Sequence, residues 1–374
     1  MNTKLVHFTT VHRRNDTRIF FKQCISLTKK YGEVKLYVAD GLGNNKHQSI
    51  EVVDVGGYKT KWGRFLSGLK MLHSLYKEKA SIYTYHDPEL FFVALILKSL
   101  GKKIVFDAHE NIRLQLHDKD WLPLKPLVIY AYPIIDWLKS KLFYITVAES
   151  SYETNYGSKE SKNVETIMNY PSISLLNKYK VVDRSSCKDL FYLGSVSELR
   201  GAYEMIDFLA QLKDGTRVLH IIGPISNDLK NSLHKYAESL NVGTNIKIYG
   251  AMSLVQALEI SKSCVLGFAI LKPVGNYLNS YSTKIFEYMA IGLPFIVSNF
   301  EIYKKLHIDE KCAFLVDPEL IEIIPKVSKF LKNKDSIENF SRSGIELVKE
   351  YNWENEEKKL FNFYDRILGL KGIE

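Results

Sequence analysis

The chain has 374 residues, which is too long for one ordinary domain and suits two. Its hydrophobic content of 46% is that of a globular protein, and no apolar run approaches the ~18 residues of a membrane span. Four scattered cysteines, with no CxxC or Cys/His cluster, argue against a structural zinc site or a disulfide framework. The first residues show no signal segment, so we expect a cytoplasmic protein.

The net charge of +9 is concentrated in the first half of the chain. Residues 1–170 hold 25 Lys and Arg against 17 Asp and Glu, whereas the remainder is nearly balanced at 26 against 25. This asymmetry suggests an anionic partner for the first half. Because we find no zinc finger, RNP-type strand or long basic helix, we do not expect this partner to be a nucleic acid. A phosphate-bearing acceptor, or contact with an anionic membrane at the inner face of the plasma membrane, fits better.

Short apolar strands alternate with helical runs along residues 1–170. The expected strands are 5–9, 34–38, 50–55, 82–85, 104–107, 145–148 and 164–167. Helical patterns fall between them, for example at 17–30, 62–79 and 88–100. Such alternation predicts an α/β fold with a mostly parallel, doubly wound sheet.

Polar residues follow the first and fourth of these strands. In the loop at 9–19, Asp16 is a good N-cap for the next helix, and the arginines at 13, 14 and 18 could reach a phosphate. After strand 82–85, Asp87 is expected to cap a helix that begins at Pro88, while His86 could face a ligand.

The helix expected at 61–76 is amphipathic and basic. Its apolar face comprises positions 62, 65, 66, 69, 72, 75 and 76, and Lys61, Arg64 and Lys70 lie off that face. We expect a core helix with one wet side. The alternative is a helix that lies on an anionic membrane. The tryptophan and phenylalanine near the start of the helix support this alternative.

Strand 104–107 ends in Asp107-Ala108-His109-Glu110. Ligands of open α/β sheets bind just beyond the carboxyl ends of strands, so this cluster is a candidate for chemistry. The alternative is a loop histidine that only hydrogen-bonds its neighbours. The nearby Asp118-Lys119-Asp120 resembles a metal-binding Asp-x-Asp, but it follows no apolar strand, and we expect a polar loop without metal.

A polar segment at 171–188 is the best candidate for a linker. A second strand–helix alternation then covers 189–352, with strands expected at 190–194, 218–222, 246–249, 265–270, 295–297 and 313–316. A last helical run, 353–368, opens the segment 353–374.

The stretch 279–294 is the most informative of the second half. It predicts a loop of small hydroxyl residues that enters a short helix, capped by Ser282 or Thr283. A helix start offers free N–H groups and a positive dipole end to a phosphate. Lys284 adds a mobile cation, and Glu287 a carboxylate for a sugar diol. The alternative is an ordinary capped helix with a Lys284–Glu287 pair.

Arg200 follows the turn that begins at Gly194-Ser195. An arginine in a strand-to-helix loop can clamp a diphosphate with two parallel hydrogen bonds. The alternative is a solvated loop arginine.

Five stretches, in this order and spacing, resemble motifs of retaining GT-B glycosyltransferases. They look most like the large family that includes bacterial capsule, lipopolysaccharide and phosphatidylinositol sugar transferases. These stretches are 11–20, 86–90, 107–110, 194–201 and 284–294. The resemblance covers nearly the whole chain. It implies two Rossmann-like doubly wound domains facing a cleft, with 1–170 binding the acceptor, 189–352 the donor, and the helix of 353–374 crossing back to the first domain.

The resemblance also implies an activity. A hexosyl or N-acetylhexosaminyl group would pass from a nucleotide-diphosphate sugar to a saccharide or lipid-linked acceptor with retention of configuration, in surface polysaccharide synthesis, without cofactor and usually without metal. The implied catalytic residues are His109, Arg200, Lys284 and Glu287. Those implied for the donor are Gly194, Ser195, Arg200, Asn279, Ser280, Tyr281, Ser282, Thr283, Lys284 and Glu287. Those implied on the acceptor side are His12, Asp16, Arg18, His86, Asp87 and Glu110.

Three departures from the family's pattern stand out. Asn279 occupies the place of the first of two glutamates, of which Glu287 matches the second and is implied to bind the ribose. Ser195 stands where one of two cations is usual, and the loop at 9–19 lacks a glycine pair. Two alternatives therefore stay open: a nucleotide-sugar epimerase of the same fold, and a non-catalytic partner subunit.

Overall fold

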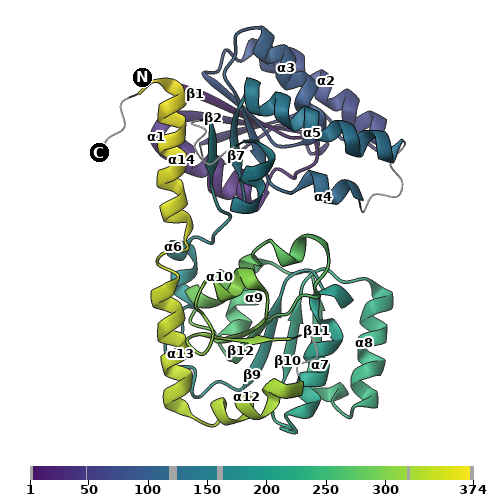
Figure 1. The fold of residues 1–374 in the computed structure, drawn as a ribbon, viewed down its shortest axis with the longest axis vertical. Helices are drawn as coiled ribbons and strands as arrows, with labels where there is room; N and C mark the ends of the chain where they lie inside the picture. Colours follow the sequence, from purple (N-terminus) through teal and green to yellow (C-terminus); the bar gives the residue numbers. More distant parts are fainter. Residues whose placement is uncertain (1–2, 48, 118–123, 158–162, 318–320, 371–374) are drawn as a thin grey trace. The chain divides into compact units, whose positions relative to one another are not determined.

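The computed structural model describes residues 3–47, 49–117, 124–157, 163–317 and 321–370. The chain divides into two compact units (Figure 1). The first consists of Met1–Asn169 and Trp353–Glu374, and the second of Tyr170–Asn352. Each unit holds one sheet between layers of helices, so the predicted α/β class is confirmed.

The sheet of the first unit has the strand order β3-β4-β2-β1-β5-β6-β7-β8. Its strands are β1 (Thr3–Phe8), β2 (Gly32–Val38), β3 (Asn45–His47), β4 (Ile50–Asp54), β5 (Ile82–Tyr85), β6 (Ile104–Ala108), β7 (Tyr144–Val147) and β8 (Val164–Thr166). Every pair is parallel except β3–β4. Sequence analysis missed β3, because its three residues are polar and exposed and show no apolar alternation.

Helices cover both faces of this sheet. On one face lie α2 (Lys61–Lys77), α3 (Phe91–Ser99) and α5 (Lys125–Leu142), which share a core with β1, β5 and β6. On the other lie η1 (Thr17–Cys24, a π-helix), α1 (Ile25–Tyr31) and the C-terminal helix α14 (Trp353–Leu368). The remaining helical segments are η2 (Pro88–Leu90), α4 (Ile112–His117) and η3 (Ser150–Asn155). Within the described ranges, no helix is long and apolar enough to cross a membrane.

Helix α2 corrects the expectation of a core-facing apolar stripe. The residues that it buries are Ser67, Gly68, Met71 and Leu75. The side chains at 62, 65, 66, 69 and 76, predicted to face the core, are exposed instead. The predicted helix is present, but a different side of it packs inward. That side carries Gly68, which lies in close contact with Leu90.

The sheet of the second unit is parallel throughout, with the order β11-β10-β9-β12-β13-β14. Its strands are β9 (Asp189–Leu193), β10 (Leu219–Ile222), β11 (Ile246–Gly250), β12 (Cys264–Ala269), β13 (Phe295–Ser298) and β14 (Ala313–Val316). Its helical segments are α6 (Ile173–Leu176), η4 (Asn177–Tyr179), η5 (Glu198–Arg200), α7 (Ala202–Gln211), α8 (Asn227–Ser239), η6 (Gly243–Asn245), α9 (Leu254–Ser261), η7 (Gly275–Leu278), α10 (Thr283–Ala290), α11 (Glu301–Lys304), η8 (Ile321–Ile323), α12 (Ile324–Phe330) and α13 (Lys334–Leu347).

The segment 171–188, expected as a linker, lies in the second unit and contains a fully buried arginine. The guanidinium of Arg184 donates hydrogen bonds to four backbone carbonyls, those of Ser261, Cys264, Ile291 and Gly292, at 2.6–2.9 Å. Burial lowers the pKa of Arg184 to about 10. One side chain thus ties the ends of α9 and α10 to the start of β12.

We expect Arg184→Met to destabilise the protein by about 3 kcal/mol or more, because it leaves several buried carbonyls without a donor. Urea unfolding followed by circular dichroism measures this change. Arg342→Met is the matched control, since Arg342 is an exposed arginine on α13. A loss below about 1 kcal/mol for Arg184→Met would show that water replaces the lost donors.

Candidate functional site

The second unit has a topological switch point at β9. This strand lies between β10 and β12, so the chain leaves it toward one side and later returns on the other. In doubly wound sheets, ligands bind in the crevice at the carboxyl ends of the strands at such a point. The residues that follow β9, and those that lie between β12 and α10, are therefore the ones to consider.

Two glycines allow the loops after β9 and β10 to approach each other closely at this edge. Gly194, directly after β9, has φ +136°, and Gly223, directly after β10, has φ +147°. A Cβ atom on Gly223 would lie 1.8 Å from the carbonyl oxygen of Gly194, so only glycine fits there. Sequence analysis singled out Gly194 but missed Gly223. The signal was present as a Gly-Pro pair immediately after a predicted buried strand.

Lys284 is the most unusual side chain of this edge. It was expected to be a mobile cation, but it is buried, and its Nζ has no hydrogen-bond partner in the described part of the chain. The Nζ lies 3.9 Å from the ring centroid of Tyr192 and beside Gly194. Burial and, to a lesser extent, the charge of Arg200 lower the pKa of Lys284 to about 7, although Glu287 opposes the shift.

Arg200 approaches the same tyrosine from η5. Its guanidinium hydrogen-bonds the hydroxyls of Tyr277 and Tyr192, which raise the pKa of Arg200 although burial opposes this. The Tyr192 hydroxyl in turn donates to the carbonyl of Ser195 at 2.6 Å. Two cations thus converge on one aromatic side chain at the switch point. This arrangement suits an anion with more than one charged oxygen.

The loop before α10 holds the other residues implied for the donor. Glu287 is half-buried on α10, one turn after Lys284. Ser282 occupies the N-cap position, as predicted, but its side chain makes no capping hydrogen bond. Its backbone N–H donates instead to the Tyr303 hydroxyl at 3.1 Å. Asn279 is exposed at the end of η7. Ser195 and Thr283 are exposed, and Ser280 and Tyr281 are partly buried.

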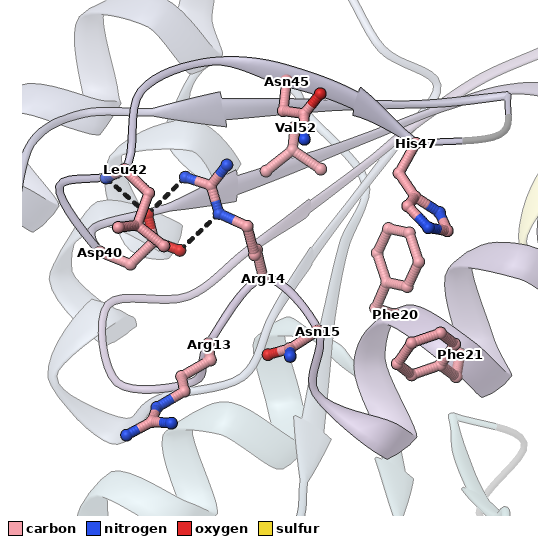
Figure 2. Close-up of a pocket in the computed structure, with 10 residues that line it drawn as sticks. All are labelled: Arg13, Arg14, Asn15, Phe20, Phe21, Asp40, Leu42, Asn45, His47 and Val52. Carbon is pink, nitrogen blue, oxygen red and sulfur yellow. Dashed lines mark hydrogen bonds and ion pairs between the residues drawn. The ribbon is translucent and has the colours of Figure 1, made fainter. Parts of the chain in front are cut away.

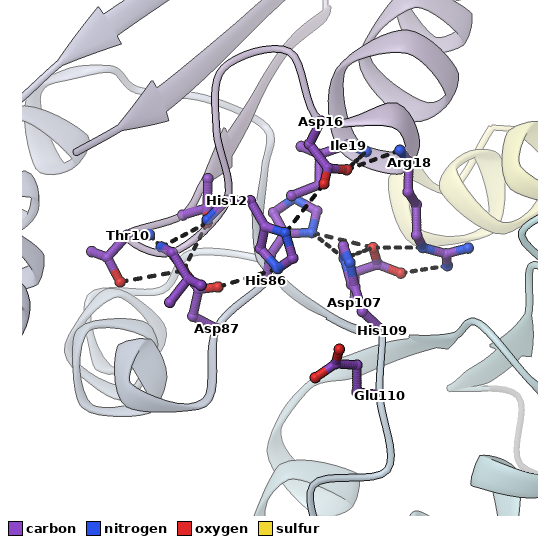
Figure 3. A network of polar contacts seen from close by, with 12 residues as sticks. Thr10, His12, Asp16, Arg18, Ile19, His86, Asp87, Asp107, His109 and Glu110 are labelled. Carbon is purple, nitrogen blue, oxygen red and sulfur yellow. Dashed lines mark hydrogen bonds and ion pairs between the residues drawn. The ribbon is translucent and has the colours of Figure 1, made fainter. Parts of the chain in front are cut away.

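In the first unit, Asp107 is the centre of a buried polar network (Figure 3). Its carboxylate accepts hydrogen bonds from Arg18 (2.7 and 3.2 Å), Gln23 (2.8 Å) and Thr146 (2.7 Å), and it pairs with His109 at 2.6 Å. Burial alone would raise the pKa of Asp107, but Arg18 and His109 hold it well below its usual range. Asp107 is thus a fixed anion that orients His109 rather than a proton donor.

This geometry corrects the expectation that Arg18 reaches a phosphate. Arg18 is 3% exposed, and a third hydrogen bond runs from it to the carbonyl of Ile167 at 2.7 Å. Arg14 is also occupied, because it forms a bidentate pair with Asp40 at 2.6 and 2.7 Å. Of the three arginines in this loop, Arg13 is the exposed one.

Two histidines form a chain behind His109. His86 is fully buried, with Nδ1 lying 2.9 Å from Nε2 of His109 and 3.2 Å from Asp107, and with Nε2 lying 3.1 Å from Nδ1 of His7. Burial lowers the pKa of His86 to about 4 and that of His7 well below its usual range. Both rings are therefore neutral at physiological pH. From sequence, His86 was expected to face a ligand. It is instead buried and supports His109.

Asp87 also differs from the expectation that it caps a helix. It does not cap η2 with its side chain. Its carboxylate instead accepts hydrogen bonds from the Thr9 hydroxyl (2.8 Å) and from the backbone N–H groups of Thr10 and Val11. Asp87 thus holds the loop after β1, which carries His12.

His12 and Asp16 form a second pair on this loop. His12 lies 3.2 Å from Asp16, and its ring contacts that of His109 at a tilt of 38°, with centroids 4.8 Å apart. Asp16 also caps η1 through the N–H groups of Arg18 and Ile19, as predicted. Burial would lower the pKa of His12, but Asp16 and Asp87 raise it. Glu110 is exposed beside this group.

The ligand atoms of His86, Asp107 and His109 lie within 4.8 Å of one another, as in some metal sites. The guanidinium of Arg18 already neutralises the Asp107 carboxylate. A metal ion there would face this fixed positive charge at close range, so the arrangement fits an oriented histidine better than a metal centre. The Asp118-Lys119-Asp120 motif lies outside the described residues.

A pocket of about 400 Å³ adjoins the same loop (Figure 2). The Arg14–Asp40 pair stands on one side of it, and the rings of Phe20, Phe21 and His47 stand on the other. Aromatic rings beside a charged pair can stack on a sugar while the pair hydrogen-bonds its hydroxyls. Sequence analysis missed this pocket, because β3 supplies His47 and was not predicted.

Comparisons with known proteins agree with this architecture. Residues 180–347 match the family described as Glycosyl transferases group 1. The comparison with curated protein sequences finds no match. Among solved structures, sucrose-phosphate synthase from Thermosynechococcus elongatus is similar at a TM-score of 0.75 and 13% identity, covering 98% of this chain and 99% of that one.

Two further structures are similar over nearly their whole length. The Anabaena protein HepE, in complex with UDP and glucose, has a TM-score of 0.70 and 12% identity, covering 97% of this chain and 99% of that one. WaaG, a glycosyltransferase involved in lipopolysaccharide biosynthesis, has a TM-score of 0.69 and 14% identity, covering 98% of this chain and 100% of that one. The chain therefore has the GT-B fold, and the family match at 180–347 falls within its second unit.

Proposed function

We propose that this protein transfers a sugar from a nucleotide-diphosphate donor to a saccharide or lipid-linked acceptor, with retention of configuration, in surface polysaccharide synthesis. The observation that carries the proposal is Lys284. A buried amine without a hydrogen-bond partner is costly to the fold, so a function must maintain it. Lys284 lies near Arg200 at the switch point of a parallel sheet, so we infer that its function is to bind the donor diphosphate.

The proposed chemistry needs no metal, because the chain supplies the positive charge. The bond between the sugar C1 and the diphosphate oxygen breaks, and a bond from C1 to an acceptor oxygen forms on the same face. The acceptor proton passes to the departing phosphate. Arg200 and Lys284 stabilise the charge that develops on that phosphate.

His109 is proposed to hydrogen-bond the reacting sugar or the acceptor. Its Nε2 lies 2.6 Å from Asp107, so that nitrogen carries the hydrogen and Nδ1 remains for the substrate. The pocket of Figure 2 is the proposed acceptor site, since it lies beside the loop that carries His12 and Asp16.

We expect Glu287→Ala to weaken binding of a nucleoside diphosphate at least about tenfold, because the ribose diol loses a charged acceptor worth roughly 1.5–3 kcal/mol. UDP is the first ligand to test, since HepE was solved with it. Calorimetric titration measures the affinity, and Glu259→Ala on α9 is the control, with an exposed carboxylate in the same unit. Unchanged affinity in a folded Glu287→Ala variant would remove this residue from the site.

The lowered pKa of Lys284 predicts a pH dependence of UDP binding. The diphosphate stabilises the charged amine and so raises its pKa, which means that binding above pH 7 must take up a proton. We expect the affinity to fall roughly eightfold between about pH 7.5 and 8.5. Titrations in two buffers of different ionisation enthalpy measure the uptake. Lys284→Met should abolish both effects; if it retains them, another group titrates.

A further inference from the structure

Three helices of the first unit present one outer surface. α2, α3 and α5 cover the same face of the sheet and contribute to one core (Figure 1). α3 is the shared neighbour: Gly68 of α2 lies against Leu90 and Val93, and the Nζ of Lys139 on α5 lies 5.9 Å from the ring centroid of Phe91. The outward sides of the three helices therefore adjoin one another.

That surface is rich in large apolar side chains at helical spacing. They are Trp62, Phe65, Leu66, Leu69 and Tyr76 on α2, Phe92 and Ile96 on α3, and Leu127, Tyr130, Ile134 and Trp137 on α5. Trp62 is 79% exposed and Tyr130 is 81% exposed. Single exposed apolar residues are ordinary, but many of them gathered on three adjoining helices indicate an interaction surface.

The charges on the same helices are almost all positive. Together α2, α3 and α5 carry eight Lys and Arg residues and one acid, Asp136. That acid is buried, where it pairs with Arg113 and Lys139. The three helices thus expose apolar rings and lysines but no carboxylate. Aromatic and aliphatic side chains flanked by lysines are the composition that binds anionic lipid surfaces.

We propose that this surface of α2, α3 and α5 binds peripherally to a bilayer that contains anionic lipid. The apolar side chains would enter the interfacial layer while the lysines meet the phosphate headgroups. The proposal goes beyond sugar transfer and does not rest on it, because binding can be measured without donor or acceptor. A second copy of this chain is the competing occupant, but repulsion between two basic surfaces disfavours it.

Sedimentation of the full chain with vesicles tests the proposal. We expect binding to phosphatidylcholine vesicles that contain phosphatidylglycerol, weaker binding to phosphatidylcholine alone, and release by salt. The triple variant Trp62→Ser/Tyr130→Ser/Trp137→Ser should bind at least about tenfold more weakly. Leu254→Ser/Val255→Ser, which removes exposed apolar side chains from α9, should bind as the parent does.

A matched pair of charge variants tests the electrostatic part. Lys70→Glu/Lys141→Glu should lower binding to anionic vesicles at least about tenfold. Lys235→Glu/Lys332→Glu makes the same change in net charge on exposed lysines of the second unit and should have a much smaller effect. All of these positions are exposed, so the thermal midpoints of the variants should match that of the parent.

Three results would overturn the proposal. One is no sedimentation with anionic vesicles. Another is an equal loss of binding in the two charge variants, which would mean that net charge and not this surface decides. The third is a dimer in light scattering that the triple variant dissociates, which would make a second copy the occupant of the surface.

Discussion

Lys284→Met is expected to weaken UDP binding roughly 10- to 100-fold and at the same time to leave the protein as stable as the parent, or more so. The loss of affinity follows from removing a charged partner of the diphosphate, worth roughly 1.5–3 kcal/mol. The stability follows from removing a buried amine whose Nζ has no hydrogen-bond partner in the described residues. Opposite effects on binding and on folding are the signature of a residue kept for function.

Calorimetry with UDP and with uridine separates the two parts of the ligand. Lys284→Met and Arg200→Ala should each weaken UDP much more than uridine, because both cations lie at the edge where the diphosphate is proposed to bind. Lys262→Met is the control, since Lys262 is a partly exposed lysine of the same unit. An equal loss for UDP and uridine would mean that the substitution disturbs the fold and that the two cations form no clamp.

His109→Ala is expected to lower the rate of sugar transfer at least about 100-fold while leaving UDP affinity nearly unchanged. His109 belongs to the first unit, whereas the proposed diphosphate site lies in the second. Asp107 and His86 hold its ring in one orientation, so alanine removes a preorganised group. Transfer rates with a matched donor and acceptor, beside a UDP titration, measure the two effects.

His73→Ala provides the comparison, since His73 is an exposed histidine of α2. Transfer by His109→Ala at the parent rate would reduce this residue to a structural member of the network. A loss of UDP affinity in step with the loss of rate would assign His109 to ground-state binding rather than to a distinct catalytic role.

Much of the fold follows from local pattern. Buried parallel strands are continuous apolar runs between turn residues. All thirteen strands expected from sequence therefore differ from the observed ones by at most two residues at either end. The strand β3 escaped because its pairing depends on β4 and not on its own composition. Sequence analysis did not predict which side of α2 is buried for a related reason. That choice depends on a tertiary contact, the one between Gly68 and Leu90.

The candidate site was predictable as a set of motifs but not as an electrostatic arrangement. The spacing placed Gly194, Arg200 and Lys284 near one strand edge, and the structure agrees. Sequence could not show that Lys284 is buried, because a lysine on an otherwise apolar helix face looks like an interruption of that face. Nor could it show that Arg18 neutralises Asp107, since the two residues are far apart in the chain.

The most direct test of the account is calorimetric titration of the full chain with a panel of nucleoside diphosphates, repeated with Lys284→Met. The account predicts that one member of the panel binds with one site per chain, and that Lys284→Met weakens this binding at least about tenfold. Failure of every nucleoside diphosphate to bind the folded parent protein would contradict the account and favour a non-catalytic role for the GT-B fold.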